Sequence, residues 1–106
     1  MSRTGLEPAT TPLLVDLDDL NDFLLFAQAK LNLSKLTSVQ YLRRVRAFLR
    51  GRSFVTDRDI QVYIQRKKES CAPYYVSNII SSFKAYFRNY KGLSWMVISI
   101  LRALLS

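Results

Sequence analysis

The sequence predicts an all-α protein of four amphipathic helices followed by a short apolar helix. Apolar residues recur at spacings of three and four, which is helical periodicity. The glycines and prolines fall between the periodic segments, where helices start and end. The four predicted helices cover residues 17–32, 35–50, 57–68 and 74–91, and the apolar helix covers residues 94–105.

Length and composition limit the classes of function. A chain of 106 residues fits one domain, and its net charge of +8 favours a polyanionic partner, either nucleic acid or an anionic membrane surface. A single cysteine, Cys71, and the absence of histidine exclude an internal disulfide and an ordinary zinc site, and remove the commonest general base. We expect no cofactor and no metal.

The expected location is the cytoplasm. Met1 to Pro12 lacks the hydrophobic run that follows the basic start of a signal peptide. The longest apolar run, Trp95 to Leu105, is about half the roughly 20 residues that a membrane-spanning helix needs. We therefore expect a soluble protein without a membrane partner.

Positive charge is concentrated in the middle of the chain. Residues 1–34 hold two bases and five acids, net −3, whereas residues 35–91 hold thirteen bases and three acids, net +10. A solvated surface of mixed charge would not separate in this way, so the basic block predicts a binding function. The alternative is a soluble helical protein whose basic charge serves no binding function.

The chain divides into an extended tail over residues 1–15, a domain over residues 16–92 and a linker or packing helix over residues 93–106. Asp16 is the expected N-cap of the first helix, and the acids that follow it suit the positive end of the helix dipole. Those acids point to different faces, which argues against a metal cluster. The expected core stripe is Leu17, Leu20, Leu24, Ala27 and Leu31.

The second helix has one apolar and one basic face. Ser34 is its expected N-cap, and Val39, Leu42, Val45 and Leu49 form its expected buried side. At 100° per residue the opposite face holds Gln40, Arg43, Arg44, Ala47 and Arg50. Arginine is favoured where bases or phosphates are held by a bidentate fork.

The third helix is expected to begin with a capping box formed by Thr56 and Asp59. Ile60 and Ile64 are expected core residues. The basic run at residues 66–68 lies near the helix C-terminus, where the helix dipole accounts for it as well as weak phosphate contacts do.

The fourth helix is expected to follow Pro73, a residue suited to a first helical turn, and to end at Gly92. Its broad apolar face is rich in aromatic residues. The opposite face contains no acid and holds Ser77, Ser81, Lys84 and Arg88, flanked by Tyr74, Asn78 and Ala85. Hydroxyls followed by bases suit a helix seated in a DNA groove.

These patterns together resemble the N-terminal core-binding domain of the tyrosine recombinase (phage integrase) family. Val55 to Ile64 is similar to the family's third helix, and Ala72 to Phe87 is similar to its fourth helix. The resemblance covers roughly residues 20–92. Departures are Ala72, where a serine is usual, and the bulky Tyr74 and Tyr75, so a sequence preference cannot be carried over.

The resemblance implies an orthogonal SAM-like four-helix bundle whose second and fourth helices lie in the major groove of double-stranded DNA. It further implies a truncated or split integrase that does not cleave DNA, because the family's catalytic residues lie in a C-terminal domain. Other recombinase protomers or a separate catalytic domain are the implied protein partners. The predicted DNA-contacting residues are Lys35, Thr37, Gln40, Arg43, Arg44, Arg50, Tyr74, Ser77, Asn78, Ser81, Lys84 and Arg88.

Two alternatives stay open. A stand-alone regulator of DNA would use the same two helices. A helical protein-interaction module would instead associate through the apolar segment Trp95 to Leu105, which cannot be a stable exposed helix by itself.

Overall fold

Helices dominate the fold in a computed structural model, which describes residues 13–93. The all-α class predicted from the sequence is confirmed for these residues. The predicted helix at residues 94–105 and residues 1–12 of the predicted tail lie outside the described residues. The elements are β1 (Leu13–Leu14), α1 (Asp19–Ala29), α2 (Lys35–Leu49), β2 (Phe54–Val55), α3 (Asp57–Ser70), α4 (Pro73–Phe83) and the π-helix η3 (Lys84–Tyr90).

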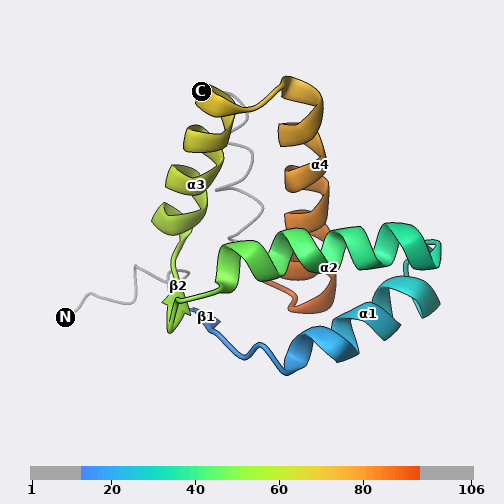
Figure 1. The fold of residues 1–106 in the computed structure, drawn as a ribbon. Coiled ribbons are helices and arrows are strands. Elements are labelled where there is room, and N and C mark those ends of the chain that lie inside the picture. The colour runs from blue at the N-terminus through green and yellow to red at the C-terminus, as the bar shows by residue number, and fades with distance from the viewer. Residues whose placement is uncertain (1–12, 94–106) are drawn as a thin grey trace.

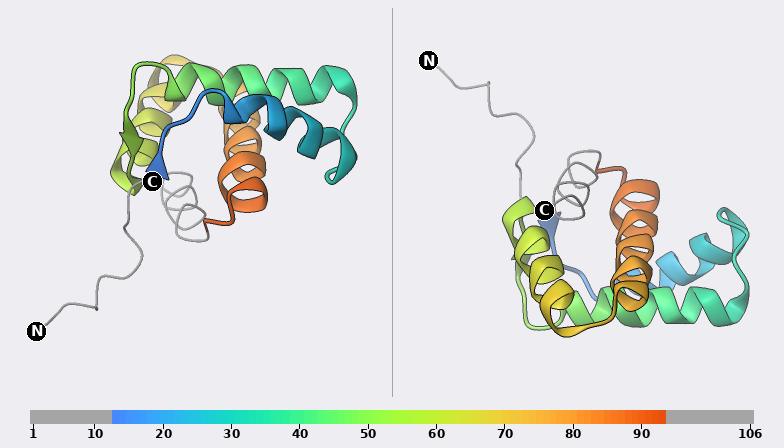
Figure 2. Two further views of the ribbon diagram at one scale, coloured as in Figure 1. Left: turned by 90° about the horizontal axis from the view of Figure 1, so that it is seen from below. Right: turned by 90° about the horizontal axis from the view of Figure 1, so that it is seen from above.

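The arrangement of the helices is built around α2. In Figure 1, α1 approaches along one side of α2, and the chain reverses through a short turn between them. Helix α4 runs across α2, whereas α3 lies beside α4 near the C-terminal end of α2, as the views in Figure 2 also show. Helix α4 packs against α2 and α3, and η3 packs back against α1. Every helix therefore contributes to one shared core.

Aromatic rings from three helices and η3 form the centre of that core. The ring centroids of Phe48 on α2 and Phe83 on α4 lie 5.0 Å apart, and Phe87 on η3 lies 6.2 Å from Phe48. Phe23 on α1 meets Tyr86 edge-on at 5.1 Å. All five residues are buried. Edge-to-face pairs of this kind add to the stabilisation that burial of apolar area gives.

Three predicted helix starts are confirmed. The Ser34 side chain accepts a hydrogen bond from the backbone N–H of Thr37 at 3.1 Å. Thr56 and Asp59 form the full capping box at the start of α3, each side chain accepting from the backbone N–H of the other. Pro73 occupies the first turn of α4. The ends of α2 and α3 fall within two residues of the predicted ones.

The first helix is shorter than the predicted range of 17–32. The prediction of Asp16 as the N-cap is wrong, because the N-cap position of α1 is Asp18. The Asp16 carboxylate instead accepts a hydrogen bond from the backbone N–H of Asp18 at 3.0 Å, in the turn before the helix. At the other end Asn32 has a φ of 56°, a left-handed value that an α-helix does not contain. Leu17 consequently lies outside the helix and is 39% exposed, so its predicted place in the core is wrong.

A two-stranded sheet was not predicted. Leu13 pairs with Val55 and Leu14 with Phe54 in antiparallel register, and the Val15 N–H donates to the Ser53 carbonyl at 3.0 Å. The end of the predicted extended tail is therefore extended as expected, but it is bonded to the segment between α2 and α3.

The predicted single helix over residues 74–91 is divided in two. It is α-helical to Phe83 and then continues as the π-helix η3. Within this region three consecutive residues, Ala85, Tyr86 and Phe87, are buried. The wider i→i+5 turn accommodates them, and the Lys91 N–H accordingly bonds to the Tyr86 carbonyl at 2.9 Å.

Candidate nucleic-acid interface

The predicted polar face of α2 is exposed along its length. Lys35, Gln40, Arg43 and Arg50 are all exposed. Thr37 is half-buried and accepts a hydrogen bond from the Ser34 hydroxyl at 3.0 Å. Since α2 has 15 residues, its two ends lie roughly 22 Å apart. Lys35 and Arg50 therefore lie at opposite ends of this face.

Arg44 connects this face to α4. Its Nη1 donates to the Ser82 hydroxyl at 3.4 Å, across 38 positions of the sequence. Ser82 is fully buried and donates in turn to the Asn78 carbonyl at 2.9 Å. The Arg44 guanidinium is therefore held beside the turn of α4 that contains Asn78 and Ser81. This contact joins α2 to the buried side of α4, one position along the chain from the exposed Ser81.

The predicted face of α4 is exposed along its α-helical part. Ser77 and Ser81 are exposed, Asn78 is half-buried, and Tyr74 at the helix start is 79% exposed. These four side chains lie on one side of the helix by their spacing.

The part of the face contributed by η3 differs from the prediction. Lys84 is half-buried and Arg88 is exposed. A π-turn turns less per residue than an α-turn, so Arg88 does not lie in line with Ser77 and Ser81 as a continuous α-helix would place it. The structure therefore turns Arg88 away from the line of Ser77 and Ser81.

Charge on this surface is of one sign. Helices α2 and α4 and the π-helix η3 contain no acidic residue. Between residues 13 and 93, the ion pairs with carboxylates join Arg52 to Asp59 at 3.8 Å and Lys91 to Asp19. Neither pair uses a predicted DNA-contacting base. These bases are therefore not neutralised by carboxylates of the described residues.

Not every base of the central block belongs to this surface. Arg52 donates from Nε to the Phe48 carbonyl at 2.8 Å and lies over the Phe48 ring at 4.5 Å, which makes it a structural residue. Lys67 lies 5.3 Å from the centroid of the Tyr63 ring. Part of the net charge of residues 35–91 therefore supports the fold.

Asp19 has a tertiary role that its place among helix-start acids did not indicate. Its Oδ1 accepts from the Tyr90 hydroxyl at 2.7 Å, and its Oδ2 forms the ion pair with Lys91 Nζ. Burial alone raises the pKa of Asp19, but the contacts from Lys91 and Tyr90 outweigh it and lower the pKa below its ordinary value. Burial and the hydrogen bond to Asp19 raise the pKa of Tyr90 to about 12.

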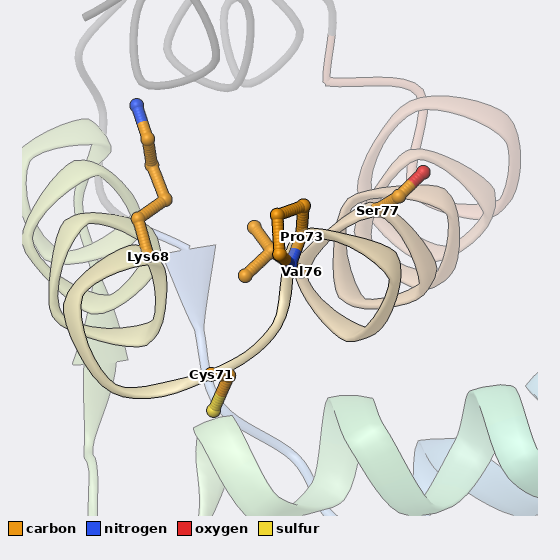
Figure 3. A pocket seen from close by; sticks show the side chains of 5 residues that line it. All are labelled: Lys68, Cys71, Pro73, Val76 and Ser77. Atoms are coloured by element: carbon orange, nitrogen blue, oxygen red, sulfur yellow. The ribbon is translucent and has the colours of Figure 1, made fainter.

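A mainly apolar cavity of about 200 Å³ lies at the junction of α3 and α4. Figure 3 shows Lys68 from α3 and Ser77 from α4 on opposite sides of it, with Cys71 in the connecting turn. Within residues 13–93 no three histidine, cysteine or acidic side chains are close enough to hold a metal ion. In the same range no helix is both long and apolar enough to cross a membrane.

Sequence reasoning missed Ser82 because it lies on the apolar side of its helix, where its spacing marks it as a core position. The one available signal was that a small polar residue interrupts an otherwise apolar face. These residues define a small helical domain with exposed, acid-free faces on α2 and α4. Comparisons with protein-family models, curated proteins and solved structures give no match.

Proposed function

We propose that the chain binds double-stranded DNA through the faces of α2 and α4 and catalyses no reaction on it. The observation that carries the proposal is the exposed, acid-free basic face of α2, whose Arg44 contacts the equally acid-free helix α4. A polyanion is the natural partner of such a surface, because phosphate contacts from lysine and arginine release bound counterions.

The shape and chemistry of the surface favour duplex DNA. A major groove about 12 Å wide admits an α-helix. Arg43 and Arg44 can each donate two parallel hydrogen bonds to a guanine edge or a phosphate. The hydroxyls of Ser77 and Ser81 can bond to either group. The proposed contacts are therefore of two kinds, phosphate contacts that position the protein and side chains able to reach base edges.

The resemblance to recombinase core-binding domains extends the proposal. The chain would then be the non-catalytic, DNA-binding part of a tyrosine recombinase, with a SAM-like fold. A separate catalytic domain or other protomers would complete the assembly in the cytoplasm. Its support is the order of the motifs in residues 20–92.

Fluorescence anisotropy of a labelled duplex tests DNA binding at two salt concentrations. We expect affinity to fall steeply with added salt, because several phosphate contacts contribute. Arg43→Ala and Arg44→Ala should each weaken binding by about 1–3 kcal/mol, and a phosphate-contacting arginine should also reduce the salt slope by about 1.

Arg58→Ala is the matched control, because it removes the same charge from an exposed position on α3 that lies outside the two faces. It should leave affinity close to that of the unmodified chain. Absent binding, binding that is independent of salt, or equal losses in all three variants would refute the proposed surface. The duplex should also be recovered uncut.

A further inference from the structure

Helices α1 and α2 carry outward stripes that complement each other. Along α1 and its N-cap, the exposed positions Asp18, Asp22 and Leu25 follow one another at spacings of four and three residues, so they form one line along the outer side. On α2 the exposed positions Leu36, Gln40 and Arg43 form a similar line at spacings of four and three. Each stripe has an apolar end and a charged or polar end.

The two leucines are unusually open for their size. Leu25 is 65% exposed and Leu36 is 69% exposed. A single exposed leucine is ordinary on a protein surface. Here each leucine lies seven residues from a charge. Asp18 precedes Leu25, Arg43 follows Leu36, and the two charges have opposite signs.

The spacing fits an antiparallel pairing of the stripes. Asp18 lies seven residues before Leu25, whereas Arg43 lies seven residues after Leu36. Seven residues of helix rise roughly 10 Å in both cases. If Leu25 of one chain packs against Leu36 of another, antiparallel helices place Asp18 level with Arg43. Asp22 then lies level with Gln40, an amide that can donate to its carboxylate.

We infer that a second copy of this chain docks on these stripes and forms a two-fold dimer. The α1 stripe of each copy pairs with the α2 stripe of the other. A two-fold axis uses each pairing twice, which doubles the contact obtained from one short stripe. The net charge of +8 opposes the association, and the pairing places the acid-rich part of each chain against the basic helix of its partner.

The dimer would control the proposed DNA surface. Gln40 and Arg43 belong to both contacts, so one helix cannot hold a partner chain and a DNA groove at the same time. This consequence rests on the proposed function, whereas the dimer itself does not.

Sedimentation equilibrium of the full chain without DNA tests the dimer, at one fixed low salt concentration. We expect a concentration-dependent mass approaching two chains. Leu25→Ser and Asp18→Arg should each raise the dissociation constant roughly tenfold or more, through lost apolar burial and through repulsion of Arg43 respectively. Combining Asp18→Arg with Arg43→Asp should restore the association, because the pair is re-formed with its charges exchanged.

Leu14→Ser is the control, since Leu14 is an exposed leucine on β1 outside both stripes. A monomer at every concentration would overturn the inference. So would an assembly that Leu25→Ser and Asp18→Arg leave unchanged, which would indicate association through another part of the chain. If the dimer forms as expected but duplex DNA does not dissociate it, the dimer stands and the shared use of Arg43 with DNA is refuted.

Discussion

The Tyr90 hydroxyl donates a hydrogen bond to Asp19 Oδ1 at 2.7 Å and so joins two residues that are 71 positions apart. Asp19 begins α1 and Tyr90 ends η3. The Tyr90 ring also packs on Phe26 of α1 with centroids 5.2 Å apart. The start of the first helix is therefore fixed to the end of the last described helix by polar and apolar contacts together.

Tyr90→Phe should lower the free energy of unfolding by about 1–2 kcal/mol, because it removes one hydrogen bond to a charged, part-buried acceptor and keeps the ring packing. Urea unfolding followed by circular dichroism measures the change. Tyr74→Phe is the matched control, since its hydroxyl is exposed and should contribute little. Equal effects of the two variants would mean that the Tyr90–Asp19 bond adds no stability.

Stability should depend on the ionisation of Asp19 at low pH. The pKa of Asp19 is lowered in the folded chain from its ordinary value of 3.8, so the folded state favours the carboxylate. The stabilisation is therefore fully present above about pH 4 and is lost as pH falls through the folded pKa. Asp19→Asn should be less stable than the unmodified chain at pH 6, and this difference should shrink towards pH 3. A difference that stays constant with pH would contradict the lowered pKa.

Thr56→Ala should destabilise the chain by about 1 kcal/mol, because it leaves the Asp59 N–H at the start of α3 without its side-chain acceptor. Thermal or urea unfolding provides the measurement. Thr56→Ser keeps the hydroxyl and should retain most of the stability. If the serine variant loses as much as the alanine variant, the methyl group rather than the cap contributes at this position.

Ser82→Ala should weaken DNA binding, because it removes the acceptor that holds the Arg44 guanidinium beside α4. The loss should be smaller than that of Arg44→Ala, since the arginine itself remains. In a double-mutant cycle Ser82→Ala should add little once Arg44 is alanine. Additive losses would show that Ser82 acts on binding independently of Arg44, and circular dichroism would check that both variants stay helical.

The sequence predicted the helices and most of their starts because those signals are local. Ser34 and Thr56 each bond to a backbone N–H three residues on, so a short stretch contains both partners. The sheet could not be predicted in this way, because two-residue strands have no recognisable pattern and Leu13 finds its partner at Val55. The length of α1 was overestimated because the left-handed Asn32 gives only a weak signal.

The candidate site was predictable one helix at a time. Spacing alone placed Arg43 on one face and Ser81 on another, and both are exposed. How these helices lie relative to each other depends on the crossing of α2 and α4, where Arg44 bonds to Ser82. Helical periodicity within one segment does not predict that crossing. The position of Arg88 depends on a π-turn that tertiary burial of aromatic residues favours. Its alignment with Ser77 therefore could not be read from helical spacing.

The π-helix η3 should allow the chain to lose one residue without unfolding this helical segment. Each i→i+5 bond encloses one residue more than the i→i+4 bond of an α-helix, so residues 84–90 are equivalent to a helix with an inserted residue. Deleting the exposed Asn89 would supply the chain length of an ordinary α-turn. We expect the deletion to preserve helix content and the hydrogen bond from Tyr90 to Asp19, because the residues after the deletion keep their places. The length of η3 could then change by one residue without separating the two ends of the domain.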